Sequence, residues 1–124
     1  PTTALDVTIQ AQILKLIKDL VIVPLINNEI LKEYNEVLTR NKFPFTEKII
    51  IETFNLFKNN GIMLERTKTK EFFADKDDIV FYEIALTGNK TNKSYLVTGN
   101  IKHFPKKSFV VTPKEMIDII ESEK

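Results

Sequence analysis

The sequence predicts an α/β fold built on a mainly parallel sheet, and two observations lead to this prediction. Short apolar runs rich in β-branched residues alternate along the chain with amphipathic helical patterns, as in a sheet whose strands are joined by helices. The run from Leu20 to Leu25 is apolar at every position, which suits a strand covered on both faces. No repeat, low-complexity tract or linker divides the chain, so we expect residues 1–124 to form a single domain.

Composition narrows the classes of protein. The chain has no cysteine, which excludes a disulfide scaffold and every thiolate metal site. No apolar run approaches the ~20 residues of a membrane span, and no signal-peptide pattern is visible. We therefore expect no membrane contact, and a reducing cytoplasm fits. The net charge of +1 is too small to indicate nucleic-acid binding by itself. Lysines nevertheless cluster locally at Lys90, Lys93, Lys102, Lys106 and Lys107.

The first half of the chain reads as three helices, with one strand between the first and the second. Ala4 to Lys18 has mostly helical apolar spacing, and the strand from Leu20 to Leu25 follows. Asn27 and Asn28 suit the N-cap of a helix whose apolar face is Ile30, Leu31, Tyr34, Val37 and Leu38. Thr46 can cap a further helix that ends near Asn60 and Gly61.

The second half continues the alternation. Ile62 to Glu65 and Tyr95 to Thr98 read as strands, separated by a helix from Asp75 to Leu86 that is apolar nearly all round and therefore buried. Phe109 to Val111 is a last strand. The following Thr112-Pro113-Lys114-Glu115 combines a capping box with proline at the first position of a helix that runs to about Ser122.

Two acidic positions stand out beyond the predicted strands. In open parallel sheets the active site lies at the carboxyl ends of the strands, which directs attention to Asn27–Glu33 and Thr98–His103. Glu33 lies about 40° outside the apolar face of its helix, by the ~100° turn per residue, so it can line the rim of a cleft. An ordinary surface glutamate is the alternative.

Three aspartates open the buried helix that begins near Asp75. Asp75 is the best N-cap, and favourable interaction with the helix dipole explains the group without any chemistry. Asp78, however, projects on the side of Phe81, Tyr82 and Ala85, which must face the core. It is therefore the acid that we expect to be held rigidly at the edge of the sheet.

A polar turn follows the strand that ends near Thr98. It exposes Asn100 and the Thr98 hydroxyl at the carboxyl edge, although such turns are common. His103 is the only histidine, which excludes a histidine-rich metal centre. Oxygen ligands from separate helices suit Mg²⁺ or Mn²⁺, and two such ions ~4 Å apart can assist phosphodiester cleavage. The composition permits this chemistry without demonstrating it.

The order of these pieces resembles the PIN domain family, and most closely its branch of toxins from bacterial toxin–antitoxin systems. Asn27–Leu38 resembles the helix that carries the second acid of that family, and Asp75–Asp78 followed by Ala85 resembles the third-acid helix. Leu96–Asn100, Lys102–Pro105 and Val111–Pro113 are similar to its last strands and the loop between them. Each match is weak alone, but their order and spacing are specific.

The resemblance implies a three-layer α/β/α fold and Mg²⁺- or Mn²⁺-dependent cleavage of RNA. It places catalytic residues at Glu33, Asp78, Asn100 and Thr98. Many PIN domains have aspartate at the position of Asn100. Glu33 and Asp78, with Asp75 beside them, are the expected metal ligands. We expect Lys102, Lys106 and Lys107 to contact the RNA backbone. A cognate antitoxin and a second copy of the chain are the expected protein partners.

The N-terminus departs from the family pattern. A PIN domain begins with a central strand that ends in an aspartate, and Asp6 falls inside the helical pattern of Ala4 to Lys18. Too few residues separate Asp6 from Glu29 for strand, helix and strand of customary length. The sequence therefore predicts that Pro1 follows a missing first strand and that the flanking strands pair directly or with another chain.

Two functions follow from this interpretation, with a third held as distant. The first is a PIN-family ribonuclease, a toxin impaired in this chain by the loss of its first acid. The second is a degenerate, non-catalytic PIN fold that binds RNA or an antitoxin, which Asn100 favours. The distant alternative is an unrelated α/β module such as a response-regulator-like domain, in which the Thr98–Pro105 segment has no role.

Overall fold

A computed structural model describes residues 1–5, 11–38 and 47–123 of this chain. The strands are β1 (Thr2–Leu5), β2 (Val23–Ile26), β3 (Ile62–Met63), β4 (Ser94–Val97) and β5 (Val110–Val111). The helices are α1 (Ala11–Lys18), α2 (Asn28–Leu38), α3 (Glu47–Asn60), α4 (Lys76–Gly88) and α5 (Pro113–Ser122), with a short 3₁₀ helix, η1 (Ile101–His103). Strands and helices alternate along the chain, as the sequence predicts.

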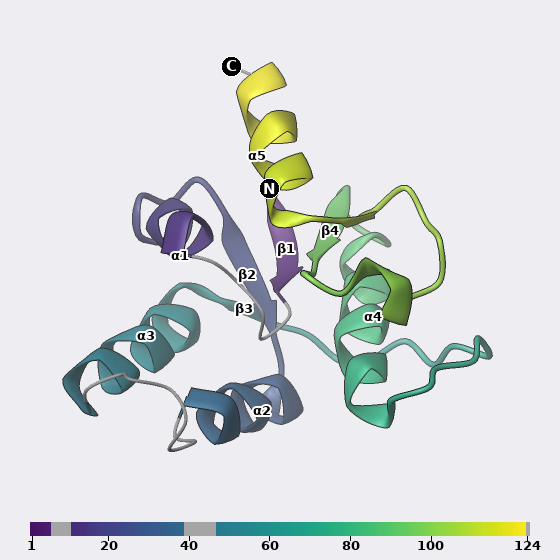
Figure 1. The fold of residues 1–124 in the computed structure, drawn as a ribbon, viewed down its shortest axis with the longest axis horizontal. Coiled ribbons are helices and arrows are strands. Elements are labelled where there is room, and N and C mark those ends of the chain that lie inside the picture. Colours follow the sequence, from purple (N-terminus) through teal and green to yellow (C-terminus); the bar gives the residue numbers. More distant parts are fainter. Residues whose placement is uncertain (6–10, 39–46, 124) are drawn as a thin grey trace.

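All five described strands form one parallel sheet in the order β3-β2-β1-β4-β5 (Figure 1). β1 is the central strand and pairs on one side with β2 and on the other with β4. Its last residue, Leu5, lies opposite Val97, the last residue of β4. The predicted mainly parallel sheet is confirmed.

The prediction that the first strand is missing from this chain is wrong. Residues Thr2–Leu5 form it, and β2 and β4 are separated by it instead of pairing with each other. Short strands and a short helix make this possible. β1 and β2 have 4 residues each, and the described helix between them has 8. The helix predicted to start at Ala4 begins only at Ala11 among the described residues, because Thr2–Leu5 is β-branched or apolar and pairs with two strands.

Burial explains why β1 occupies the centre. Ala4 and Leu5 are completely buried, as is the Thr3 side chain. The Thr2 and Ser94 hydroxyls lie 2.6 Å apart, so a hydrogen bond links neighbouring strands in addition to the backbone ladder. A strand paired on both edges satisfies its backbone groups without water.

The strand predicted from Leu20 begins three residues later, because α1 ends in a turn that consumes those residues. The Leu20 amide donates to Ile17 O at 3.0 Å and the Val21 amide donates to Leu16 O at 2.8 Å. These two hydrogen bonds form a Schellman motif, with Leu20 in the left-handed position at φ 62°. The turn directs the chain into β2.

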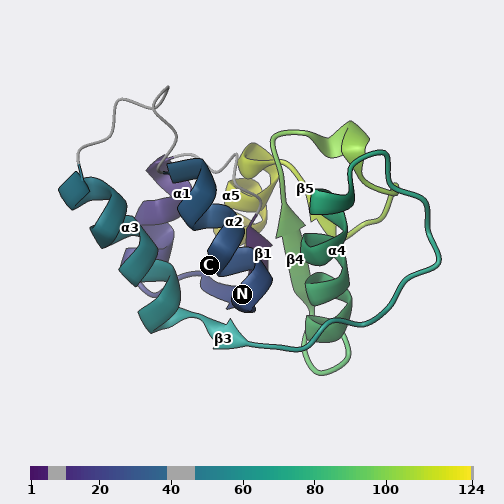
Figure 2. The same ribbon diagram turned by 90° about the horizontal axis from the view of Figure 1, so that it is seen from below.

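Helices cover both sides of the sheet (Figures 1 and 2). α4 packs against β1, β2 and β4, whereas α3 packs against β2 and also contacts α1 and α2. Figure 2 shows α1, α2 and α3 on one side of the central strands and α4 on the other. The core between these layers includes Leu25, Ile30, Phe57, Ile84 and Leu96, each at most 1% exposed. This arrangement is the predicted three-layer fold.

The ends of the helices follow the predicted capping chemistry where they are described. Asn27 Oδ1 accepts from the Ile30 amide at 2.8 Å at the start of α2. Thr112 and Glu115 form the expected capping box at the start of α5. The predicted cap Thr46 lies outside the described residues.

Gly61, after α3, is required by close packing. A Cβ atom there would lie 2.6 Å from the Phe57 carbonyl oxygen and 2.6 Å from Ile26 Cδ1. The left-handed conformation that commonly favours glycine after a helix is absent at this residue.

Candidate functional site

The carboxyl ends of β1 and β4 meet at the centre of the sheet, where the order of the strands reverses. The chain proceeds from β1 outward to β2 and β3, then crosses to β4 and β5 on the other side. Crevices that bind ligands form at such switch points. Leu5 and Val97 end the two strands in register, so the carboxyl ends of β1 and β4 lie side by side.

Thr98 and Asn100 lie directly after β4, and the two residues have different surroundings. Thr98 is 1% exposed, its amide donates to Val111 O at 3.0 Å, and its Oγ1 accepts from the Asn100 amide at 2.9 Å. Asn100 is exposed and caps η1 without a side-chain hydrogen bond. Thr98 therefore shapes the turn, and Asn100 presents its amide at the carboxyl edge.

Asp78 reaches the same loop from α4. It lies in the first turn of that helix, and its side chain is 15% exposed. Its Oδ2 lies 3.5 Å from Nδ1 of His103, the last residue of η1. In Figure 2, η1 lies beside the start of α4. The structure therefore brings Asp78 to the segment after β4, as a residue held at the edge of the sheet.

Glu33 lies on α2, and the helix is fixed to the end of the central strand. Its neighbour Tyr34 is 3% exposed, and the Tyr34 hydroxyl donates a hydrogen bond to the Leu5 carbonyl. The Tyr34 ring packs on Phe57 and Phe81 with centroid distances of 4.4 and 6.1 Å. Glu33 itself is partly buried, as expected for a residue at the rim of the apolar face.

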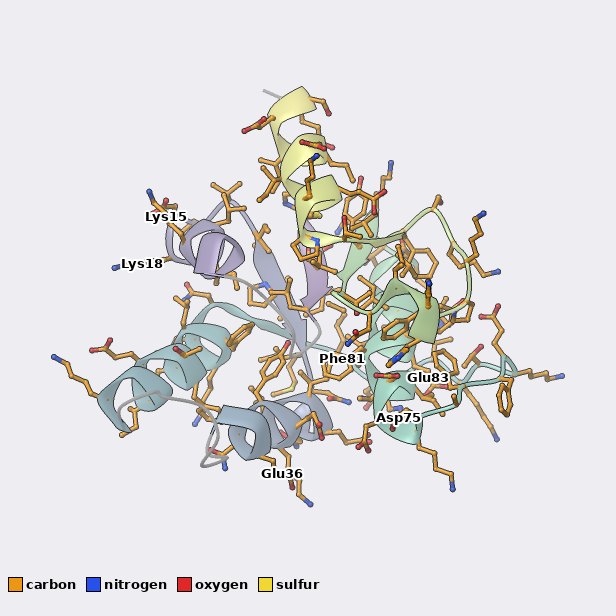
Figure 3. The ribbon with its side chains drawn as sticks, viewed as in Figure 1. Lys15, Lys18, Glu36, Asp75, Phe81 and Glu83 are labelled. Atoms are coloured by element: carbon orange, nitrogen blue, oxygen red, sulfur yellow. The ribbon has the colours of Figure 1, made fainter. Side chains whose placement is uncertain are left out.

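A charged pocket of about 260 Å³ separates the start of α4 from α2. Figure 3 shows Glu36 on α2 and Asp75 at the start of α4, both at the lower end of the molecule in that view. Glu33 lines this pocket together with Asp77, whereas Asp78 is not among its lining residues. The other lining residues are Glu29, Lys32, Glu36, Arg66, Lys76 and Val80.

Arg66 joins the two walls of this pocket. Its Nη1 lies 2.6 Å from Glu29 Oε2 on α2, and its Nη2 lies 2.6 Å from Glu83 Oε1 on α4. The Arg66 Nε also donates to Glu83 Oε1 at 2.7 Å, and the Thr69 amide donates to Glu83 Oε2 at 2.7 Å. Glu83 has a side chain only 6% exposed, so these partners stabilise its buried charge.

Asp75 serves as the N-cap of α4. It has an extended backbone, and its Oδ1 accepts from the Asp77 amide at 2.9 Å. Asp75 is exposed and one of its oxygens is engaged with the helix. The predicted capping role is confirmed, and the geometry makes Asp75 a weaker candidate for a metal ligand than Glu33 or Asp78.

The three lysines predicted to contact RNA line one pocket beyond η1. This second pocket also has a volume of about 260 Å³ and includes Lys102, Lys106 and Lys107. Lys107 is in addition held by Glu71, with Nζ 3.4 Å from Glu71 Oε1. Glu71 accepts a hydrogen bond from the Tyr82 hydroxyl, which, with Lys107, holds the pKa of the Glu71 carboxyl below its usual value. Burial and the Glu71 carboxylate raise the pKa of Tyr82.

The oxygen donors of Glu33, Asp78, Thr98 and Asn100 suit a hard divalent cation in kind. Their number is insufficient by itself. Among residues 1–5, 11–38 and 47–123, no group of three or more acidic or histidine side chains lies close enough to hold a metal ion. Asp6 follows β1 directly in the sequence and lies outside the described residues. The described donors therefore form at most part of a metal centre.

Sequence reasoning missed Arg66 and Glu83. Glu83 interrupts a helix that is otherwise apolar nearly all round, and a charge at such a position requires a buried partner. That rule predicts an ion pair but not Arg66 as the partner, which comes from the segment between β3 and α4. The helical pattern predicted from Ala4 to Lys18 includes Asp6, but Ala4 and Leu5 belong to β1, so Asp6 follows a strand directly in the sequence.

None of the helices in the described part of the chain has the length and apolar character needed to cross a membrane. The chain matches neither a curated protein nor a solved structure at a significant level. The sequence model of the PIN domain matches residues 5–102, which is most of the chain and runs from the end of β1 to η1. PIN domains have a nuclease-like fold and are generally divalent-metal-dependent ribonucleases. On its fold and on this match, the chain belongs to the PIN domain family.

Proposed function

We propose that this protein is a metal-dependent ribonuclease whose active centre lies at the carboxyl ends of β1 and β4. The observation that carries the proposal is the meeting of Asp78 with the segment after β4, where its carboxylate lies 3.5 Å from His103. A mostly buried acid from α4 thus lies beside η1, the 3₁₀ helix that Asn100 caps, at the switch point where such folds bind ligands. Membership of the PIN domain family supports nuclease chemistry at this edge of the sheet.

Three carboxylates from three elements form the proposed acid set. Asp78 comes from α4, Glu33 comes from α2, and Asp6 is the residue that follows β1 in the sequence. The bond from Tyr34 to the Leu5 carbonyl supports this grouping, because it fixes the helix of Glu33 to the residue before Asp6. With Asp6 restored as a candidate, the expected impairment by a missing first acid loses its basis.

These acids would hold Mg²⁺ or Mn²⁺, which when bound would activate water and neutralise charge on a phosphodiester. Asn100 would orient a ligand or a phosphate oxygen, and the Thr98 hydroxyl would position Asn100 through its backbone amide. Asparagine adds no negative charge, so this centre should bind a cation more weakly than one with a fourth carboxylate. Lys102 and Lys106 would contact the RNA backbone, with Lys107 partly engaged by Glu71.

Cleavage of single-stranded RNA with Mn²⁺ or Mg²⁺ tests this proposal. We expect Asp78→Asn to lower the cleavage rate by about 10²-fold or more, with folding unchanged. Asp118→Asn is the matched control, because it removes the same charge from an exposed aspartate on α5 that does not line the pocket of Glu33. Equal activity of Asp78→Asn and the parent would reject the assigned role, and no cleavage by the folded parent would reject the ribonuclease.

We further propose that the ribonuclease is the toxin of a bacterial toxin–antitoxin pair that acts in the cytoplasm. The support is the likeness of Asn27–Leu38, Asp75–Asp78 and Leu96–Asn100 to that branch of the family. Expression of the chain should then arrest growth, and the Asp78→Asn variant should not. Growth unaffected by an active, soluble enzyme would count against a toxin. An antitoxin would be the partner that restores growth, and association of two copies of the chain would appear in its solution mass.

A second candidate function is a non-catalytic PIN fold that binds RNA or an antitoxin. Asn100 in place of an acid favours it, as does the absence of a three-acid group within the described residues. RNA binding that is unaffected by Mn²⁺, by a folded chain that cleaves nothing, would support this function over the ribonuclease.

A further inference from the structure

A small pocket on the far side of η1 combines an apolar lining with a cationic rim. Ile101, Phe104 and Pro105 contribute apolar surface, and Lys102, Lys106 and Lys107 contribute the charges. No carboxylate lines it. We propose that this pocket binds one unstacked nucleobase of a single-stranded RNA, with the flanking phosphates on the lysines; this inference rests on the proposed function.

The size of the pocket suits a single base. Its volume of about 260 Å³ leaves room for one planar ring system. A duplex presents its bases stacked and paired, so a recessed site of this kind selects single strands. Apolar contact with a base is tolerant of sequence, since every base has an apolar face.

The pocket has a firm lining. Phe104 is 7% exposed, and its ring meets the Phe73 ring edge to face at a centroid distance of 6.0 Å. Phe73 in turn packs against Tyr82 of α4 at 5.3 Å. Ile101 lines the pocket and is 39% exposed, although large apolar side chains are usually buried. A ligand that packs on Ile101 would cover it.

The charge of the rim selects an anionic ligand. Lys102 and Lys106 are exposed, and none of the residues that line the pocket with them carries a carboxylate. Lys107 should attract an anion less strongly than the other two lysines, because the carboxylate of Glu71, which does not line the pocket, already neutralises part of its charge. We therefore assign most of the phosphate attraction to Lys102 and Lys106.

The position of the pocket relates it to the acid centre. η1 is only three residues long. Two adjacent residues within it, Lys102 and His103, belong to the pocket and to the acid centre respectively. Lys102 lines the pocket, whereas His103 lies 3.5 Å from Asp78. A strand that places a phosphate at Asp78 therefore passes η1, and a base close to the cleaved bond can enter the pocket. This route favours RNA over an acidic peptide as the occupant.

Binding of a short fluorescent RNA to the full chain in EDTA tests the inference without any cleavage. We expect Ile101→Ser to weaken binding about fivefold or more without changing its dependence on salt. Lys102→Ala should instead lower the slope of log affinity against log salt by about 0.7, as for one lost phosphate contact on a single strand. Lys114→Ala, an exposed lysine on α5 outside the pocket, is the control and should change neither.

The outcomes separate this inference from the proposed function. Ile101-dependent RNA binding by a chain that does not cleave would uphold the pocket and reject the ribonuclease. Cleavage with RNA affinity unchanged in Ile101→Ser would do the reverse. Equal affinity for a duplex of the same sequence, or Ile101-dependent binding of an acidic peptide without RNA binding, would overturn the nucleobase site. Circular dichroism of the Ile101→Ser chain verifies its fold, and Lys106→Ala provides a second test of the rim.

Discussion

Leu20 has a strained backbone conformation at the turn between α1 and β2. It is 72% exposed and adopts a φ of 62°, where L-residues other than glycine are disfavoured. The Schellman hydrogen bonds to Ile17 and Leu16 compensate for that conformation by closing the end of α1. The turn carries the chain into β2, beside the central strand.

We predict that Leu20→Gly stabilises the protein by about 0.5–1 kcal/mol. Glycine relieves the left-handed strain and the side chain lost is mostly in solvent, although the unfolded chain gains some entropy. Urea unfolding of the two chains measures the change. The neighbouring Lys18→Gly, inside the helix and at an ordinary φ, should destabilise by a comparable amount. A loss of stability in Leu20→Gly would contradict the assigned strain.

The Tyr82 and Glu71 pair is a second feature at this scale. The Tyr82 ring is buried, and its hydroxyl donates to a carboxylate in the segment before α4. That hydrogen bond, with the help of Lys107, lowers the pKa of Glu71 from its ordinary 4.5. A lowered pKa in the folded state means that ionised Glu71 stabilises the fold above the ordinary value.

Tyr82→Phe should reduce the free energy of unfolding by about 1–2 kcal/mol at neutral pH, because it keeps the ring and removes a hydrogen bond to a charge. The difference between the two chains should shrink as the pH falls below 4.5 and through the lowered pKa of Glu71, where the carboxyl becomes protonated in both states. Chemical unfolding at a series of pH values measures it. A difference that is constant across the acid range would show that the ion is unimportant.

At the scale of elements, Arg66 fixes the spacing of α2 and α4. Its guanidinium contacts Glu29 on one helix and the buried Glu83 on the other. Glu33 and Asp78 lie on these same two helices, so the ion pairs influence how the candidate acids face each other. The exposed pair with Glu29 contributes little to stability, whereas the pair with Glu83 satisfies a buried charge.

Arg66→Ala should destabilise the fold by about 2–3 kcal/mol, because it leaves the Glu83 charge without its cation. Combining it with Glu83→Gln should recover part of this loss, since the buried charge is then removed as well. Lys68→Ala in the same segment is the exposed control. Thermal or denaturant unfolding of the parent, Arg66→Ala, Glu83→Gln and the double variant measures the coupling, and additive effects would show that Arg66 and Glu83 act independently.

Most elements could be predicted from the sequence, since their signals are local. The capping box of Thr112 and the N-cap of Asn27 depend on a few neighbouring residues, and both are confirmed. β1 could not be found in this way. Its four residues are too short for a periodic pattern, and only the pairing with β2 and β4 selects a strand there.

At the scale of the whole molecule, the topology decides which polar residues share a site. The order β3-β2-β1-β4-β5 places the ends of β1 and β4 together, whereas the sequence predicted that the central strand was missing from this chain. Asp78 and Thr98 were predicted at this edge, and the structure places Asp78 beside the loop of Thr98 through His103. The groove shared by Glu33 and Asp77 was not predicted, because it depends on how α2 and α4 pack.

We propose that Asp6, which follows β1 in the sequence, Glu33 of α2 and Asp78 of α4 each supply one carboxylate to a single cation site, and Mn²⁺ affinity tests this most directly. Free Mn²⁺ is measured by electron paramagnetic resonance during a titration. Asp6→Asn and Asp78→Asn should each raise the dissociation constant for Mn²⁺ about tenfold or more, a loss of ~1.4 kcal/mol or more of binding free energy. Asp19→Asn, an exposed acid after α1, should bind as the parent does. Unchanged Mn²⁺ affinity in both Asp6→Asn and Asp78→Asn would contradict the account.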